Sequence, residues 1–200
     1  ADYIESLARN LYNRMLNSRM IDIQQQADPP FTFAYTGYGQ DLSNLDNYFL
    51  YAFVKEGGME KGITAVLRAT RQAYLHGFQA SELERQKQEI LRAAEKAANE
   101  QGKTPSAGLA GGFVSHFLKG NAVPTAKQRL ALLQQLLPMI SVEDINPLPI
   151  EWIRPSERVV SVTGPDTEAN PLPTEAELER WLNKFDEMDV TPYEDNLVTG

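Results

Sequence analysis

The chain has 200 residues, 42% hydrophobic and 23% charged, which suits one large domain, or one domain with an appendage, around a substantial core. Its formal net charge of −8 argues against a nucleic-acid partner, because phosphate binding requires a basic face. The absence of cysteine excludes disulfides, thiolate nucleophiles and cysteine-ligated metals. No apolar run reaches transmembrane length and no basic amphipathic helix indicates a membrane partner. The start also lacks the basic and apolar regions of a signal peptide, which is consistent with a fragment or a processed product.

The first elements predicted are a helix, a hairpin and a second helix. Apolar residues at helical spacing predict a helix over residues 3–20. Aromatic and β-branched runs predict strands over residues 31–39 and 47–56, joined by a polar turn into an antiparallel hairpin. The second strand is apolar at successive positions, so we expect both of its faces to be covered. A helix is predicted over residues 59–76, with Gly77 ending it in a left-handed conformation.

Helix-start signals divide the middle of the chain. Ser81 and Glu84 have the spacing of a capping box and predict a helix to about residue 100. A helix over residues 104–119 is predicted next, because Thr104 is a good N-cap and is followed by proline. Two more capping boxes are predicted, at Thr125 with Gln128 and at Ser141 with Asp144. The helix that follows the first box should stop at Pro138, and the one that follows the second should break at Pro147 and Pro149.

The last segment reads as a strand, a linker and an amphipathic helix. Residues 158–165 predict a short strand, and the composition of residues 166–173 is typical of a linker. Thr174 and Glu177 cap a helix predicted over residues 174–188. Its apolar stripe includes Trp181, and the short linker favours docking onto the chain's own surface over contact with a neighbour. We therefore divide the chain into a domain over residues 1–165 and a linker region over residues 166–200.

A search for reactive groups predicts no catalytic, cofactor-binding or metal-ligating residue. His76 and His116 are the two histidines, and neither has a second histidine or a carboxylate at ligand spacing. Three glycines fall in residues 108–112 within a helical pattern, which favours close helix packing over phosphate binding. The glutamates of the predicted helices are typical of solvated faces, and a hydrolase that uses paired carboxylates would require a separate acidic cleft.

Several segments together resemble one peptidase family over roughly residues 3–190. These segments are LARNLYNRMLNSRMIDI, ADPPFTFAY, KEGG, GFQASELERQKQEIL and RVVSVTGP. Their order resembles the pitrilysin/insulinase (inverzincin) zinc peptidases, especially the bacterial branch with two fused halves. The prolines at positions 147 and 149 depart from the pattern, because the family usually has an unbroken helix there.

The resemblance implies an α+β fold with a mostly antiparallel sheet covered by several helices, a metallohydrolase-like domain of the mitochondrial processing peptidase type. The H-x-x-E-H zinc site with its downstream Glu belongs to the family's first domain. This chain resembles the second, non-catalytic domain of one half. Only three strands are recognisable here, so the leading part of that domain is expected to be missing. No cofactor is then expected on this chain, and zinc is expected in the catalytic domain of the full-length protein.

As the second domain of a half, the chain would form part of the wall of a closed chamber that holds peptide. Its implied partners are the other domains of the same polypeptide and, through the chamber, a peptide substrate, in a periplasmic or otherwise extracytoplasmic location. The alternative is a catalytically inactive structural subunit related to these peptidases. Some family members hold substrate with an Arg and a Tyr; the nearest matches here are Arg19 with Phe33 or Tyr35, at a longer spacing. We do not count them as site residues.

Overall fold

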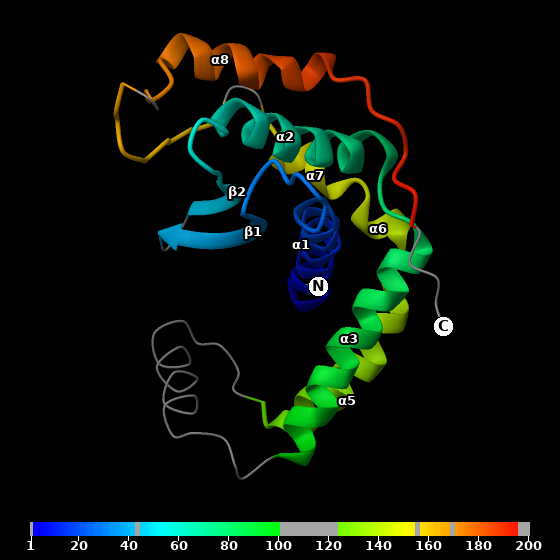
Figure 1. Cartoon of the computed structure of the whole chain (residues 1–200). Coiled ribbons are helices and arrows are strands. Elements are labelled where there is room, and N and C mark those ends of the chain that lie inside the picture. Colours follow the sequence, from blue (N-terminus) through cyan, green and yellow to red (C-terminus); the bar gives the residue numbers. More distant parts are fainter. Residues whose placement is uncertain (1, 43–44, 101–123, 155–156, 169–170, 196–200) are drawn as a thin grey trace.

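The computed structural model describes residues 2–42, 45–100, 124–154, 157–168 and 171–195. The fold is α+β, as predicted: a two-stranded antiparallel sheet packs against a set of helices (Figure 1). The elements are α1 (Asp2–Gln24), β1 (Phe33–Leu42), β2 (Leu45–Phe53), α2 (Met59–His76), α3 (Ala80–Asn99), α5 (Ala126–Leu136), the 3₁₀ turn η1 (Leu137–Met139), α6 (Val142–Ile145), α7 (Leu148–Trp152), α8 (Glu175–Asn183) and the 3₁₀ turn η2 (Lys184–Glu187).

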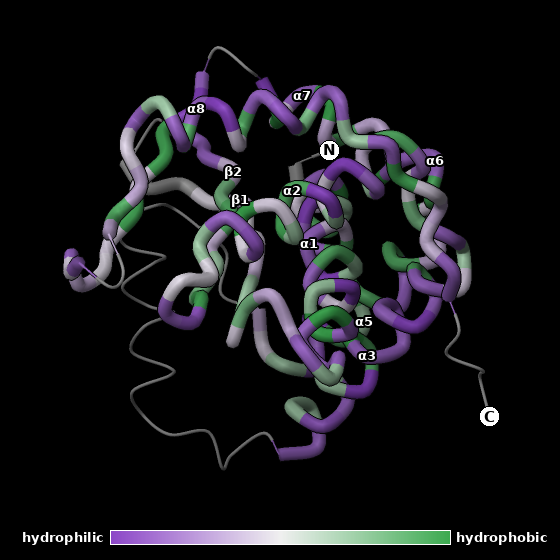
Figure 2. The backbone as a smooth tube through the Cα atoms, turned by 45° about the horizontal axis from the view of Figure 1, so that its top comes forward, coloured by the Kyte–Doolittle hydropathy of each residue, from purple (hydrophilic) through white to green (hydrophobic). Residues whose placement is uncertain are grey.

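Helix α1 is the centre of the core. Its residues Leu11, Tyr12, Met15 and Leu16 have no exposed surface, because β1, α2, α3 and α6 all pack around this helix. Figure 2 shows hydrophobic stretches along α1 and α5, and α5 packs against α3, which in turn packs against α1. The helix is longer than the predicted 3–20, and it ends before the two prolines that follow it.

Helix α1 covers one face of the β1–β2 hairpin. The same helix also bonds to the backbone of β1 at the edge of the hairpin that does not pair with β2. Phe33 pairs with Phe53, and the register is regular as far as Gln40 opposite Asp46, after which it shifts between Gln40 and Leu42. The Thr36 amide donates to Asn17 Oδ1 at 2.7 Å, and Asn17 Nδ2 donates to the Thr36 carbonyl at 3.0 Å. The amide side chain of Asn17 thus satisfies the outer edge of β1 as a neighbouring strand would.

The prediction that both faces of the second strand are covered is wrong. On one face Ala34 and Thr36 are buried against α1, whereas on the other Tyr51 and Phe53 are 51% and 59% exposed. Alternate residues of a strand point to opposite faces, so a single helix layer covers only half of an apolar strand. The exposed half is aromatic, which is why the sequence reads as a buried strand.

The bounds of α2 agree with the prediction, and Gly77 ends the helix at φ +68°, a conformation that favours glycine. The capping box predicted at Ser81 and Glu84 is wrong, because α3 begins two residues earlier than that spacing suggests. The carboxylate of Glu82 accepts a hydrogen bond from the Gln79 amide at 2.8 Å and caps this helix. Glu84 instead pairs with Lys87 on the surface.

Three further helix starts are confirmed: the capping boxes at Thr125, Ser141 and Thr174 are all present. The chain turns into η1 at Pro138, and the prolines at 147 and 149 divide the following segment into the short helices α6 and α7, as predicted. The helix predicted over residues 104–119 lies outside the described residues.

The strand predicted over residues 158–165 is not formed. This segment has no regular secondary structure and pairs with neither β1 nor β2, and Val159 is 97% exposed. A β-strand needs a neighbouring strand for its backbone hydrogen bonds, and neither β1 nor β2 provides one for this segment. The described residues therefore form two strands where the sequence predicts three.

The amphipathic helix after the linker docks in cis, as predicted. Helix α8 and η2 lie along α2 (Figure 1), with Trp181 7% and Phe185 4% exposed. The ring of Phe185 lies 6.2 Å from that of Tyr74 on α2. Burial of this apolar stripe against α2 accounts for the return of the chain to its own surface.

Candidate functional site

The most strongly built polar arrangement in the described residues is a buried ion pair between α1 and α3. The side chains of Arg19 and Glu82 are 2% and 3% exposed. Arg19 Nε and Nη2 each donate to one carboxylate oxygen of Glu82 at 2.8 Å, and Nη2 also donates to the Gly77 carbonyl at 2.9 Å. This two-pronged contact holds α1 against the α2–α3 junction.

Two aromatic rings complete the surroundings of Arg19. Its guanidinium carbon lies 4.5 Å from the ring centroid of Phe78 and 4.3 Å from that of Tyr193. The guanidinium therefore contacts a carboxylate, a carbonyl and two rings, whereas its Nη1 is buried without a hydrogen-bond partner among the described residues. The substrate contact that the family resemblance allows for Arg19 does not fit this environment, because a peptide would have to displace the buried partners.

Tyr193 belongs to a segment that we call the C-terminal strap, residues 188–195, which runs from the end of η2 past the α2–α3 junction (Figure 1). The Tyr193 hydroxyl donates to Asp22 Oδ2 at 2.5 Å. Loss of solvent around the phenol, and then its hydrogen bond to the Asp22 carboxylate, raise the pKa of Tyr193 well above its usual range. Tyr193 therefore attaches the strap to α1, through Arg19 and Asp22.

Side chains of α2 and of the start of α3 bind the backbone of the strap. The strap carbonyls of residues 189, 190, 191 and 193 accept hydrogen bonds of 2.6 to 3.2 Å from four side chains, those of Arg68, Gln72, His76 and Gln79. Because three of these donors recur every four residues, they lie on one face of α2. The four-residue spacing of these polar side chains is visible in the sequence, but it is equally typical of a solvated helix face, so the contact with the strap was not predicted.

Charged side chains hold the far end of the strap. Asp195 accepts hydrogen bonds from Ser81 Oγ at 2.6 Å and from Arg85 Nη1 at 3.1 Å. Its carboxylate is 3% exposed, although it lies near the end of the described chain. Ser81, predicted as a helix cap, therefore binds the strap instead.

The described residues do not fit a zinc ion. His76 Nε2 lies 2.7 Å from the Val190 carbonyl, which can only accept, so this nitrogen carries the proton and binds the strap. No group of three or more potential ligands (His, Cys, Asp or Glu) occurs in the described part of the chain. His116 and the glycines at 108–112 lie outside it. None of the described helices is long and apolar enough to cross a membrane.

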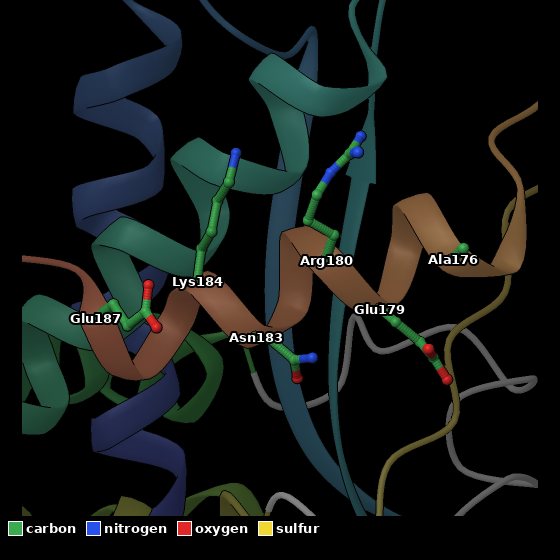
Figure 3. Close-up of a pocket in the computed structure, with 6 residues that line it drawn as sticks. All are labelled: Ala176, Glu179, Arg180, Asn183, Lys184 and Glu187. Atoms are coloured by element: carbon green, nitrogen blue, oxygen red, sulfur yellow. The ribbon is translucent and has the colours of Figure 1, made fainter.

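A surface depression of about 480 Å³ lies on α8, lined by Glu179, Arg180, Asn183 and Lys184 among others. Figure 3 shows Arg180 and Lys184 pointing to one side of the helix and Glu179 and Asn183 to the other. Lys184 already pairs with Glu60 of α2 at 3.1 Å. The basic side chains of Arg180 and Lys184 thus point away from Glu179 and Asn183. The polar groups do not converge on one point, as they would in a site that binds a small molecule or catalyses a reaction.

Comparisons with solved structures identify proteins that have a similar fold. The first half of the periplasmic protease PqqL from Escherichia coli superimposes with a TM-score of 0.80 at 14% identity, over 96% of this chain and 42% of that one. The chain shares the fold of part of this protease. A PqqL structure with a longer chain gives a TM-score of 0.74 at 14% identity, over 98% of this chain and 21% of that one.

A mutant of the ferredoxin protease FusC, in complex with Arabidopsis ferredoxin, superimposes with a TM-score of 0.62 at 14% identity. The match covers 97% of this chain and 22% of that one. No protein-family model and no curated protein sequence matches the chain. The chain thus spans less than half the length of each protease chain that it resembles, and the likeness lies in the fold.

Proposed function

We propose that this chain is a non-catalytic domain of a zinc metallopeptidase and forms part of the wall of the chamber that holds a peptide. One observation carries the proposal: 96% of the chain superimposes on part of a protease half with a TM-score of 0.80. The segments that resemble the pitrilysin/insulinase family in sequence support the same assignment independently, since that resemblance does not depend on the structure.

The contacts of the described residues are those expected of a structural domain in the chamber wall. The buried Arg19–Glu82 pair, the docked helix α8 and the C-terminal strap all fix elements to one another, and none of them gathers groups able to act on a peptide bond. In this proposal zinc is bound by another domain of the same polypeptide, and that domain carries out hydrolysis. The location proposed is periplasmic, as for PqqL.

The test compares the full-length protein that contains this chain with the 200-residue chain alone. Both are incubated with a quenched fluorescent peptide library, with and without 1,10-phenanthroline. We expect hydrolysis by the full-length protein, abolished by the chelator and restored by zinc, and none by the 200-residue chain. A full-length protein that is folded, binds no zinc and cleaves no peptide would instead support the catalytically inactive structural subunit.

A further inference from the structure

The face of the hairpin that points away from α1 is a continuous aromatic surface. We call it the aromatic face: Phe33, Tyr35, Phe49, Tyr51 and Phe53. Neighbouring rings on it are in contact, with centroids 5.3 Å apart for Tyr35 and Tyr51, 5.3 Å for Phe49 and Tyr51, and 6.1 Å for Phe33 and Phe53. At the rim Phe33, Tyr51 and Phe53 are 44%, 51% and 59% exposed.

Glycine makes this surface flat. The ring of Phe49 lies over Gly37 on the paired strand, and a Cβ at that position would stand 2.4 Å from the ring. Any other residue at position 37 would push the Phe49 ring away from the strand. The rings therefore lie close to the sheet, and their contacts with one another hold them in place.

The aromatic face has no charge. Between Phe33 and Gly39 and between Asn47 and Phe53, the remaining positions on the same side are Gly37, Gly39 and Asn47, so no Asp, Glu, Lys or Arg points to this side along these two stretches. In a chain in which 23% of residues are charged, such a surface matches an uncharged, apolar partner and would disfavour a charged one by desolvation. Exposed apolar surfaces of this kind mark sites of interaction.

The geometry limits what can cover this face. A further strand would pair at an edge of the hairpin and lie in the plane of the sheet, so it would leave the face open. Helix α1 already covers the opposite face. A partner of the aromatic face must therefore form a second layer on it, and flat stacked rings suit the apolar side chains of an extended chain.

We infer that the aromatic face binds an uncharged, apolar, extended stretch of unfolded polypeptide, and that it is the side of the domain which faces the substrate. The second clause rests on the proposed function, whereas the binding itself does not. Affinity would come mainly from Tyr51 and Phe53, which have the most exposed ring surface. Sequence selectivity would be for apolar segments and against acidic or basic ones.

The test is peptide binding to the 200-residue chain, measured by fluorescence anisotropy. The probe is a dye-labelled peptide of about 10 residues built from Leu, Phe, Ser and Thr, which spans about 33 Å when extended. We expect saturable binding that weakens about tenfold in Phe53→Ser or Tyr51→Lys, because a few central aromatic contacts dominate such interfaces. The same peptide with its apolar residues changed to Glu should not bind.

The matched control is Ile150→Ser on α7, which removes an apolar side chain of similar exposure, 60%, outside the aromatic face. It should leave peptide affinity unchanged. Both face variants alter exposed side chains, and their melting curves should confirm that they fold. Absence of saturable binding, or equal affinity in the face variants and the control, would overturn the inference.

Two other possible occupants of the aromatic face would give distinct results, and either result would also overturn the inference that the face binds a peptide. If a second copy covers the face, sedimentation will show a dimer that Phe53→Ser dissociates and the peptide does not. If another segment of the longer protein covers it permanently, hydroxyl radicals will oxidise Phe53 in the full-length protein as slowly as the buried Phe31. Because binding is measured without hydrolysis, an inactive full-length protein would refute the proposed function and leave this result standing.

Discussion

The buried Arg19–Glu82 pair gives the sharpest prediction for stability. Glu82→Gln keeps the shape of the side chain but leaves the guanidinium of Arg19, 2% exposed, without a counter-charge. Removing one member of a buried ion pair typically costs about 3–5 kcal/mol. Because the Glu82 carboxylate also accepts the Gln79 amide, the cost should lie toward the upper part of that range.

Urea unfolding followed by circular dichroism measures this loss directly. For a domain of this size it corresponds to a fall in Tm of roughly 6–20 °C. The matched control is Glu84→Gln, two residues along α3, where the carboxylate is 61% exposed and pairs with Lys87. That change should cost less than about 1 kcal/mol. Equal effects of the two substitutions would refute the reasoning and restore Glu84 as the helix cap.

The other predictions concern α8, the strap and the α2–α3 turn. Trp181→Ala removes a side chain that is 7% exposed and should cost about 3 kcal/mol in unfolding without changing the sedimentation coefficient. The folded pKa of Tyr193 is raised, so its contribution to stability is present below the unfolded pKa of about 10 and is lost as pH rises further. Tyr193→Phe should therefore make the loss of Tm above pH 10 shallower, whereas a slope identical to that of the unsubstituted chain would contradict this assignment. Gly77→Ala should cost more than Gly57→Ala, because both have positive φ but only the Cβ at 77 would meet Asn146, at 2.4 Å. Thermal melts of the two variants decide this, and equal Tm values would exclude the clash.

Elements marked by local signals could be predicted from the sequence. Thr125 and Thr174 begin helices because their hydroxyls accept backbone amides within the same turn, a contact that depends only on neighbouring residues. The apolar stripe around Trp181 likewise indicates that α8 packs on a neighbouring surface. The fold class and the resemblance to peptidases follow from the order of such elements.

Features that depend on distant partners could not be predicted. The N-terminus of α3 is set by Glu82, whose carboxylate also binds Arg19 63 residues away, and this partner outweighs the local signal at Ser81. The strand predicted over residues 158–165 is not formed, because the segment pairs with neither β1 nor β2. The sequence indicates a buried strand at the aromatic face because the residue pattern alone does not reveal which side of a strand has a neighbouring layer.

We propose above that this chain is the part of a zinc peptidase that does not bind the metal. The most direct test of this proposal is the zinc content, by inductively coupled plasma mass spectrometry, of the full-length protein and of the 200-residue chain, each purified under identical conditions. We expect one zinc per full-length molecule and none on the 200-residue chain. One tightly bound zinc on the 200-residue chain would contradict it.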